Sequence, residues 1–154
     1  MRVVLDTNVL LVSVSRRSRL HWLSESFLAG HFTLCVTTEV LAEYAEIMTR
    51  HMGSEFCDTT LEAITSAPAI RFISPTYRFN LLSDPDDNKF VDCTIAANAV
   101  CIVSHDRDFL LLRAIDFPKV AVVDTAGFHK LLSEQTQQGG KENGETINEE
   151  DIAW

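Results

Sequence analysis

The chain has 154 residues, of which 46% are hydrophobic and 23% charged, and this is the size and composition of one soluble globular domain. Its formal net charge of −9 discourages a nucleic-acid-binding function at first sight, because phosphate binders are usually basic, and it leaves room for a divalent cation held by carboxylates. The four cysteines are scattered and form no Cys-x-x-Cys pair, which argues against a zinc knuckle and favours a reducing compartment. The chain shows no export signal and no apolar run of about 18 residues. We therefore expect a cytoplasmic protein without a membrane span.

The first half of the chain predicts strands that alternate with helices. In chain order the expected elements are a strand over 2–6, a helix over 18–30, a strand over 32–36, a helix after Thr37, a helix over 55–66 and a strand over 70–74. Thr37 is a suitable N-cap, and Glu39 suits the positive end of the helix that follows. That helix carries an apolar stripe from Val40 to Met48, which predicts that one face is buried.

The second half continues the alternation. A turn-rich stretch over 80–88 is followed by a helix over 88–99, a strand over 101–104, a short helix over 107–113, a strand over 119–124 and a last helix over 125–133. Strands that alternate with helices predict an α/β fold in which helices cover both faces of a parallel sheet. We therefore expect a three-layer α/β/α sandwich with a central, mainly parallel sheet.

The last 21 residues, 134–154, have a different composition. They are rich in Gln, Gly, Glu and Asn, carry six acids against one lysine, and show no apolar periodicity. Such a segment predicts an acidic tail that is disordered or loosely docked. The expected organisation is therefore one folded domain over 1–133 and a tail over 134–154.

Several acidic side chains fall where a parallel sheet places its functional site. In such folds, sites form beyond the carboxyl ends of strands, at a switch in strand order. Asp6 ends the first strand, Asp106 follows the strand at 101–104, and Asp87 opens a helix after the turn-rich stretch. Each acid could instead have a purely structural role. An Asp at a strand end can begin a turn, and Asp87, Asp106 or Asp108 can act as a helix N-cap or stabilise the positive end of a helix.

Two further acids lie within predicted helices. Glu43 has Val40 and Ile47 three and four positions away, so it borders the buried stripe, although Glu is also a good former of exposed helix. A carboxylate on that edge needs a positive partner. Arg and Lys are poor candidates nearby in the sequence, which favours a divalent cation. Asp92 lies among apolar neighbours and also borders the core.

Four motifs together resemble the PIN domain. They are VLDTNVL at 4–10, TTEVLAEYAEIM at 37–48, DPDDNKF at 84–90 and VSHDRDFL at 103–110. More narrowly, they resemble the PIN-type toxins of bacterial toxin–antitoxin pairs. The resemblance covers residues 1–133, and it implies a PIN-like nuclease domain there.

The resemblance implies roles for individual residues. The acids that match the family's catalytic set, and that would also hold the metal, are Asp6, Glu43, Asp87 and Asp106. Asn8 matches the polar partner of the first acid, Asp108 is a further metal ligand close to the last one, and Asp92 is a second-tier ligand. Ser104 stands where the family usually has Thr and keeps the hydroxyl, while His105 replaces a residue that is often small.

The implied activity is metal-dependent hydrolysis of phosphodiester bonds in single-stranded RNA. Four carboxylates in one cleft repel one another unless a cation neutralises them, and oxygen ligands suit Mg²⁺ or Mn²⁺ rather than zinc. The cation would lower the pKa of a water and stabilise charge in the transition state, with Glu43 completing the shell or acting as general base. The side chains expected to contact substrate phosphates are Lys89 and Arg107, with a further basic edge at Arg16, Arg17 and Arg19.

The resemblance also implies an antitoxin protein as partner and a homodimer. Two alternatives stay open. A HAD-like phosphohydrolase needs a second acid two residues after Asp6, where Asn8 stands instead. A non-catalytic PIN-like binding module would have no need to retain every expected acid, and titration with Mn²⁺ would separate it from an enzyme.

The net charge can be divided by region. The segment 134–154 contributes −5 and the body −4. Once the six candidate acids are set aside, the body has 10 acids against 12 basic residues. With a cation in the cleft, the surface permits weak, salt-sensitive binding of RNA.

Overall fold

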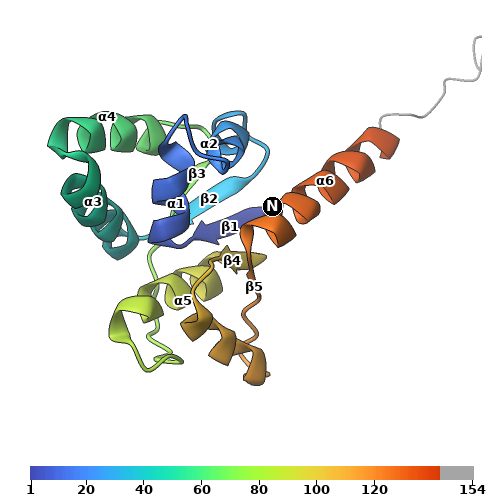
Figure 1. Cartoon of the computed structure of the whole chain (residues 1–154). Helices are drawn as coiled ribbons and strands as arrows, with labels where there is room; N and C mark the ends of the chain where they lie inside the picture. Colours follow the sequence, from blue (N-terminus) through green and yellow to red (C-terminus); the bar gives the residue numbers. More distant parts are fainter. Residues whose placement is uncertain (143–154) are drawn as a thin grey trace, which may run out of the picture.

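The computed structural model describes residues 1–142, and its centre is a parallel β-sheet (Figure 1). The strands of the described part are β1 (Arg2–Leu5), β2 (Thr33–Val36), β3 (Ile70–Phe72), β4 (Cys101–Val103) and β5 (Val122–Val123). Their order is β3-β2-β1-β4-β5, and every neighbouring pair is parallel. The order reverses beside β1, because the chain runs outward from β1 to β3 and then returns to place β4 on the other side of β1. This is the kind of switch point at which α/β folds form their sites.

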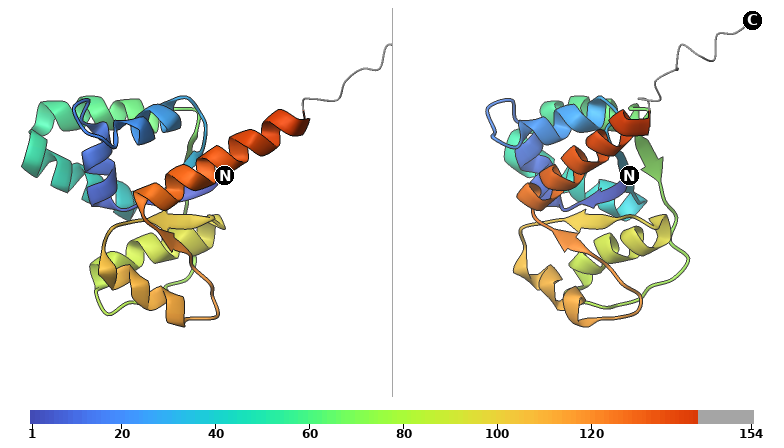
Figure 2. Two further views of the ribbon diagram at one scale, coloured as in Figure 1. Left: turned by 45° about the vertical axis from the view of Figure 1, so that its right-hand side comes forward. Right: turned by 90° about the vertical axis from the view of Figure 1, so that its right-hand side faces the viewer.

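Helices cover both faces of the sheet, which confirms the predicted three-layer fold (Figures 1 and 2). On one side lie α1 (Thr7–Val14), α2 (His21–Leu28), α3 (Thr38–Met52) and α4 (Ser54–Thr65). On the other side lie α5 (Pro85–Ala97) and the 3₁₀ helix η1 (Arg107–Ala114). The last helix, α6 (Thr125–Glu142), packs beside α2, because the ring of Trp22 lies 6.3 Å from that of Phe128 and 4.9 Å from that of His129.

The core follows from the apolar runs of the strands. Val3, Val4 and Leu5 of β1 are at most 1% exposed, as expected for a central parallel strand that is covered on both faces. The predicted cap of α3 is also present, since the Thr37 hydroxyl accepts the backbone N–H of Val40 at 3.1 Å. The tertiary structure therefore anchors β1, which Asp6 follows directly, and α3, which carries Glu43.

Helix α1 was not among the predicted elements, because the sequence analysis assigned no helix or strand between residues 6 and 18. Five of its eight residues are buried, including Val9, Leu10 and Leu11. A short helix with so many buried residues lacks the contrast between an apolar and a polar face that marks an amphipathic helix in a sequence. The correction matters for the site, because α1 starts at the residue after Asp6.

The predicted boundary at residue 133 does not coincide with the end of the last helix. Helix α6 continues to Glu142, so residues 134–142 are helical rather than disordered. The side chains of 134–139 are exposed, so no apolar stripe could reveal the helix in the sequence. Extending a formed helix adds one hydrogen bond per residue, which favours continuation through polar helix formers. The remainder of the predicted tail, 143–154, lies outside the described residues.

No helix within residues 1–142 is both long and apolar enough to cross a membrane. The four cysteines are all buried and free of disulfides. Together these findings leave the polar carboxyl edge of the sheet as the place to look for chemistry.

Candidate functional site

Acidic side chains gather at the carboxyl ends of β1 and β4, the two strands at the switch in order. The two ends are held in register, because the backbone N–H of Asp6 donates to the carbonyl of Val103 at 3.0 Å. The hydroxyl of Ser104 donates to Asp6 Oδ2 at 2.8 Å and accepts the backbone N–H of Asp106 at 3.0 Å. Ser104 therefore links an acid at the end of β1 to an acid just after β4.

Three carboxylates form the closest cluster. One oxygen each of Asp87, Asp106 and Asp108 lies within 4.8 Å of the others. Asp87 comes from the first turn of α5, whereas Asp106 and Asp108 come from the start of η1. Asp106 also has the structural role predicted for it, because it is the N-cap of η1 and accepts the backbone N–H of Asp108 at 2.9 Å. The N-cap of α5 is Asp84 rather than Asp87, so Asp87 is left facing the cleft.

Glu43 reaches the same region from the middle of α3. Its Oε2 accepts the hydroxyl of Thr7, and its Oε1 accepts the Lys89 ammonium at 3.0 Å. The expectation that no Lys or Arg would serve Glu43 was wrong. Lys89 is 46 residues away in the sequence, and the packing of α5 near α3 brings it close. Lys89 therefore pairs with a carboxylate of the protein, although it was expected to contact a phosphate of the substrate.

Asp92 does not join the cluster. Its side chain is 2% exposed, its Oδ1 accepts the backbone N–H of Phe79 at 3.1 Å, and its Oδ2 lies 3.9 Å from Nη1 of Arg78. Arg78 in turn forms a bidentate ion pair with Glu39, in which Nη1 donates to Oε2 at 2.8 Å and Nη2 donates to Oε1 at 2.7 Å. Asp92 thus fixes the loop before α5, and its position on the core-facing side of the helix places it away from the three clustered carboxylates.

The charges in the cleft affect one another. Burial raises the pKa of Asp87 to about 6, and the negative charges of Asp84, Asp106, Asp6 and Asp108 add to the effect. Burial also raises the pKa of Asp6, with smaller contributions from the charges of Asp106 and Glu43, while the Ser104 hydrogen bond opposes the rise. Both carboxylates would ionise more readily beside a cation. The donor set consists of oxygens alone, so it fits a hard divalent cation such as Mg²⁺ or Mn²⁺.

Asp6 and Asp106 line two adjoining pockets that share His105 and Asp106, and we call these pockets the two arms of the cleft. One arm contains Asp6, Asn8 and Val9 with His105 and Asp106. Asn8 is exposed there, and its neighbour Thr7 makes the contact to Glu43. The sequence analysis missed Thr7, and the signal that could have found it was its place between Asp6 and Asn8 in the first motif.

The second arm runs along η1. It contains His105, Asp106, Arg107 and Arg113, and it ends against β5 and the start of α6. Nε2 of His105 lies 3.1 Å from the hydroxyl of Thr125. The sequence analysis missed Arg113, because no motif marks it. The signal that could have found it was its spacing of six residues from Arg107 in a helix with three residues per turn.

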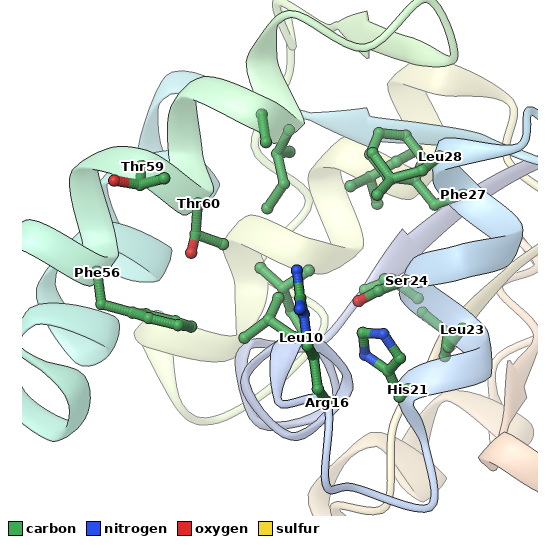
Figure 3. Close-up of a pocket in the computed structure, with 15 residues that line it drawn as sticks. Leu10, Arg16, His21, Leu23, Ser24, Phe27, Leu28, Phe56, Thr59 and Thr60 are labelled. Atoms are coloured by element: carbon green, nitrogen blue, oxygen red, sulfur yellow. The ribbon is translucent and has the colours of Figure 1, made fainter.

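A separate apolar groove lies between α1, α2 and α4 (Figure 3). Its volume is about 320 Å³, and Figure 3 shows Leu10, Phe27, Leu28 and Phe56 around it. None of the clustered acids lines this groove. Arg16, from the basic run at 16–19, lies at the groove rather than in the acidic cleft.

Comparisons with known proteins agree with this fold. Residues 2–108 match the family described as PIN domain. The structure is similar to VapBC2 from Rickettsia felis, solved with a DNA fragment from its promoter, with 20% identity, a TM-score of 0.59, and 80% of this chain and 98% of that chain covered. No curated protein sequence matches the chain significantly.

Two further solved structures are similar. VapC20 from Mycobacterium tuberculosis, a toxin that cleaves the sarcin–ricin loop, has 15% identity, a TM-score of 0.53, and 77% of this chain and 98% of that chain covered. DNA-bound VapBC from Salmonella typhimurium has 13% identity, a TM-score of 0.54, and 80% and 98% covered. At identities this low, the similarity supports a shared fold and says nothing about a shared activity.

Proposed function

The chain belongs to the PIN-domain family, and from that premise we propose that it is a metal-dependent endoribonuclease acting on single-stranded RNA, as the toxin of a toxin–antitoxin pair. The observation that carries the proposal is the meeting of acids from three separate motifs at the switch point of the sheet. Asp6 follows β1, Asp106 lies just after β4, and Asp87 comes from the first turn of α5. One cleft with this much negative charge is costly to keep without a cation.

The residues that would hold the cation are Asp87, Asp106, Asp108 and Asp6. The first three already place one oxygen each within 4.8 Å of one another. When bound, the cation would supply charge neutralisation and activate water for attack on a phosphodiester. Water would add to phosphorus while the bond to the leaving oxygen breaks, which yields a phosphate monoester and a hydroxyl.

The remaining roles fall to side chains around the acids. Glu43 is fixed by Thr7 and Lys89, so it is placed to orient a water at the wall of the cleft. Ser104 holds Asp6 and the backbone of Asp106 in one arrangement, which keeps the ligand oxygens preorganised. Arg107 is exposed beside Asp106 and is placed to contact a phosphate.

The partner we propose is an antitoxin, and the surface we propose for it is the apolar groove of Figure 3. Two of the similar structures are VapBC complexes, which supports a two-protein system of this kind. Leu28 and Phe56 at the groove are 58% and 39% exposed, and apolar side chains left in water favour a protein partner. The homodimer expected from the family stays a prediction, to be measured by sedimentation at several concentrations.

The test of the activity is the substitution Asp6→Asn. It keeps the shape of the side chain but removes its charge, so we expect Mn²⁺-dependent cleavage of single-stranded RNA to fall by at least about a hundredfold. Asp58→Asn is the matched control, because Asp58 is exposed on α4, outside the cleft. Cleavage by the Asp6→Asn protein at the rate of the control would contradict the proposal.

The same experiment addresses the alternatives. A wild-type protein that binds neither Mn²⁺ nor RNA would favour the non-catalytic binding module. A HAD-like phosphohydrolase would need a second carboxylate two residues after Asp6, and the exposed amide of Asn8, in the first turn of α1, occupies that place.

A further inference from the structure

The cleft arm along η1 has an ordered pattern of side chains. In a 3₁₀ helix there are about three residues per turn, so residues three apart lie on one face. Arg107, Leu110 and Arg113 follow that spacing, and all three line the same arm of the cleft. We call these three residues the η1 stripe.

The stripe begins at the acidic cluster. Asp106, the N-cap of η1, lines both arms of the cleft, so the stripe is continuous with the place where the acids meet. At about 2 Å of rise per residue, Arg113 lies roughly 12 Å farther along the helix than Arg107. Two cations at that separation fit two different phosphates of one strand better than a single anion.

Within the part of the chain that the structure describes, the two arginines are available to bind an anion. Within residues 1–142, Arg50, Arg78 and Lys89 each form an ion pair, whereas neither arginine of the stripe lies within 4.0 Å of a carboxylate oxygen. Both arginines are exposed, and Leu110 between them is 41% exposed. A cation, an apolar side chain and a second cation in a row match the alternation of phosphate and base or sugar along a single strand.

We propose that the η1 stripe binds the backbone of single-stranded RNA as it leaves the acidic cluster, with Arg107 on the phosphate next to the one cleaved and Arg113 on a phosphate farther along. Leu110 contacts the base or sugar between them. This inference rests on the proposed function, because it needs a nucleic-acid substrate at the acids. An acidic polypeptide is the competing occupant, but the continuity of the stripe with the acidic cluster favours the substrate.

The test measures how RNA binding depends on salt. Arg113→Gln is made in the Asp6→Asn background, so that a fluorescein-labelled single-stranded RNA of mixed sequence is bound but not cut. Each phosphate contact to a single strand contributes about 0.7 to the slope of log Kd against log salt. We expect the slope to fall by about 0.7 for Arg113→Gln and by about 1.4 for the double variant with Arg107→Gln. Binding of Mn²⁺ in the wild-type background should not change with Arg113→Gln.

The matched control is Arg71→Gln. Arg71 is exposed on β3, at the opposite edge of the sheet from β5. A slope for Arg113→Gln equal to that of Arg71→Gln would overturn the proposal. Weakened binding of poly-glutamate with unchanged binding of RNA would overturn it in favour of an acidic protein partner. Failure of the proposed function would look different, because the wild-type protein would then cut no RNA whatever the salt slope of the variants.

Discussion

Helix α1 separates two regions of opposite chemistry. Asn8, Val9 and Val12 lie along the acidic cleft, whereas Leu10 and Val14 lie along the apolar groove. The same division occurs at the end of β1, where Leu5 lines the groove and the next residue, Asp6, lines the cleft. One short segment thus supports both surfaces.

The two regions differ in what they need from a ligand. The cleft carries charges that repel one another, so we expect cations to stabilise it and its stability to depend on pH and salt. The groove exposes apolar side chains, and covering them is favourable with little dependence on either condition. The comparison predicts that substitutions in one region leave the function of the other intact.

The largest effect that would sharpen this comparison is expected in the groove. Leu28→Glu places a charge where we propose that the antitoxin packs, and it should weaken binding of that partner by about 2 kcal/mol, which is about thirtyfold. The measurement is the affinity for the proposed antitoxin. Cleavage of RNA by the variant should equal that of the wild type.

Leu111→Glu is the matched control for the groove. Leu111 is 57% exposed on η1, against 58% for Leu28, so the two substitutions differ in place rather than in burial. Equal loss of partner binding in both variants would break the assignment of the groove.

A smaller effect is expected from the ion pair within the cleft. Lys89→Met leaves the half-buried Glu43 carboxylate without its cation and should lower the free energy of unfolding of the metal-free protein by about 1 kcal/mol. Urea denaturation measures this directly. Adding Mn²⁺ should restore part of the loss if Glu43 faces the cation site.

The pair between Glu46 and Arg50 on the same helix is the control. Its side chains are 65% and 63% exposed, compared with 19% and 17% for Glu43 and Lys89. Arg50→Gln should therefore change the free energy of unfolding by less than about 0.5 kcal/mol. An equal effect of the two substitutions would show that the cleft pair is no more important than a surface pair.

The smallest effect is expected from pH. The pKa of Asp87 is about 6 in the folded protein, above its usual value of 3.8, so the folded state holds more protons than the unfolded state between these values. The melting temperature of the metal-free protein should therefore fall as the pH rises from 4 to 6 and level off above that range. Added Mg²⁺ should offset the fall, because it favours the ionised form.

Asp87→Asn isolates this effect from the other acids. Melting curves in a chelator should show a flatter dependence on pH for this variant than for the wild type. A dependence as steep as that of the wild type would mean that Asp87 is not the group that titrates.

The family and the layers of the fold could be predicted from the sequence, but several contacts of the site could not. Apolar runs and the spacing of the four motifs are local properties, and they correctly placed the sheet and the acids at strand ends. Helix α1 was missed because five of its eight residues are buried, which weakens the periodic contrast between its faces. Helix α6 was ended early because its last turns have no apolar face.

By itself, the sequence determined that this chain is a PIN-domain protein with Asp6, Asp87 and Asp106 near the carboxyl edge of a parallel sheet. Only the tertiary structure decided which charges meet. It paired Glu43 with Lys89 across 46 residues, and it turned Asp92 toward the loop at Phe79 and away from the acidic cluster. The physical reason is that such contacts depend on how α3, α5 and the loop before α5 pack together. That arrangement is set by the burial of side chains throughout the core and is not a local property of any motif.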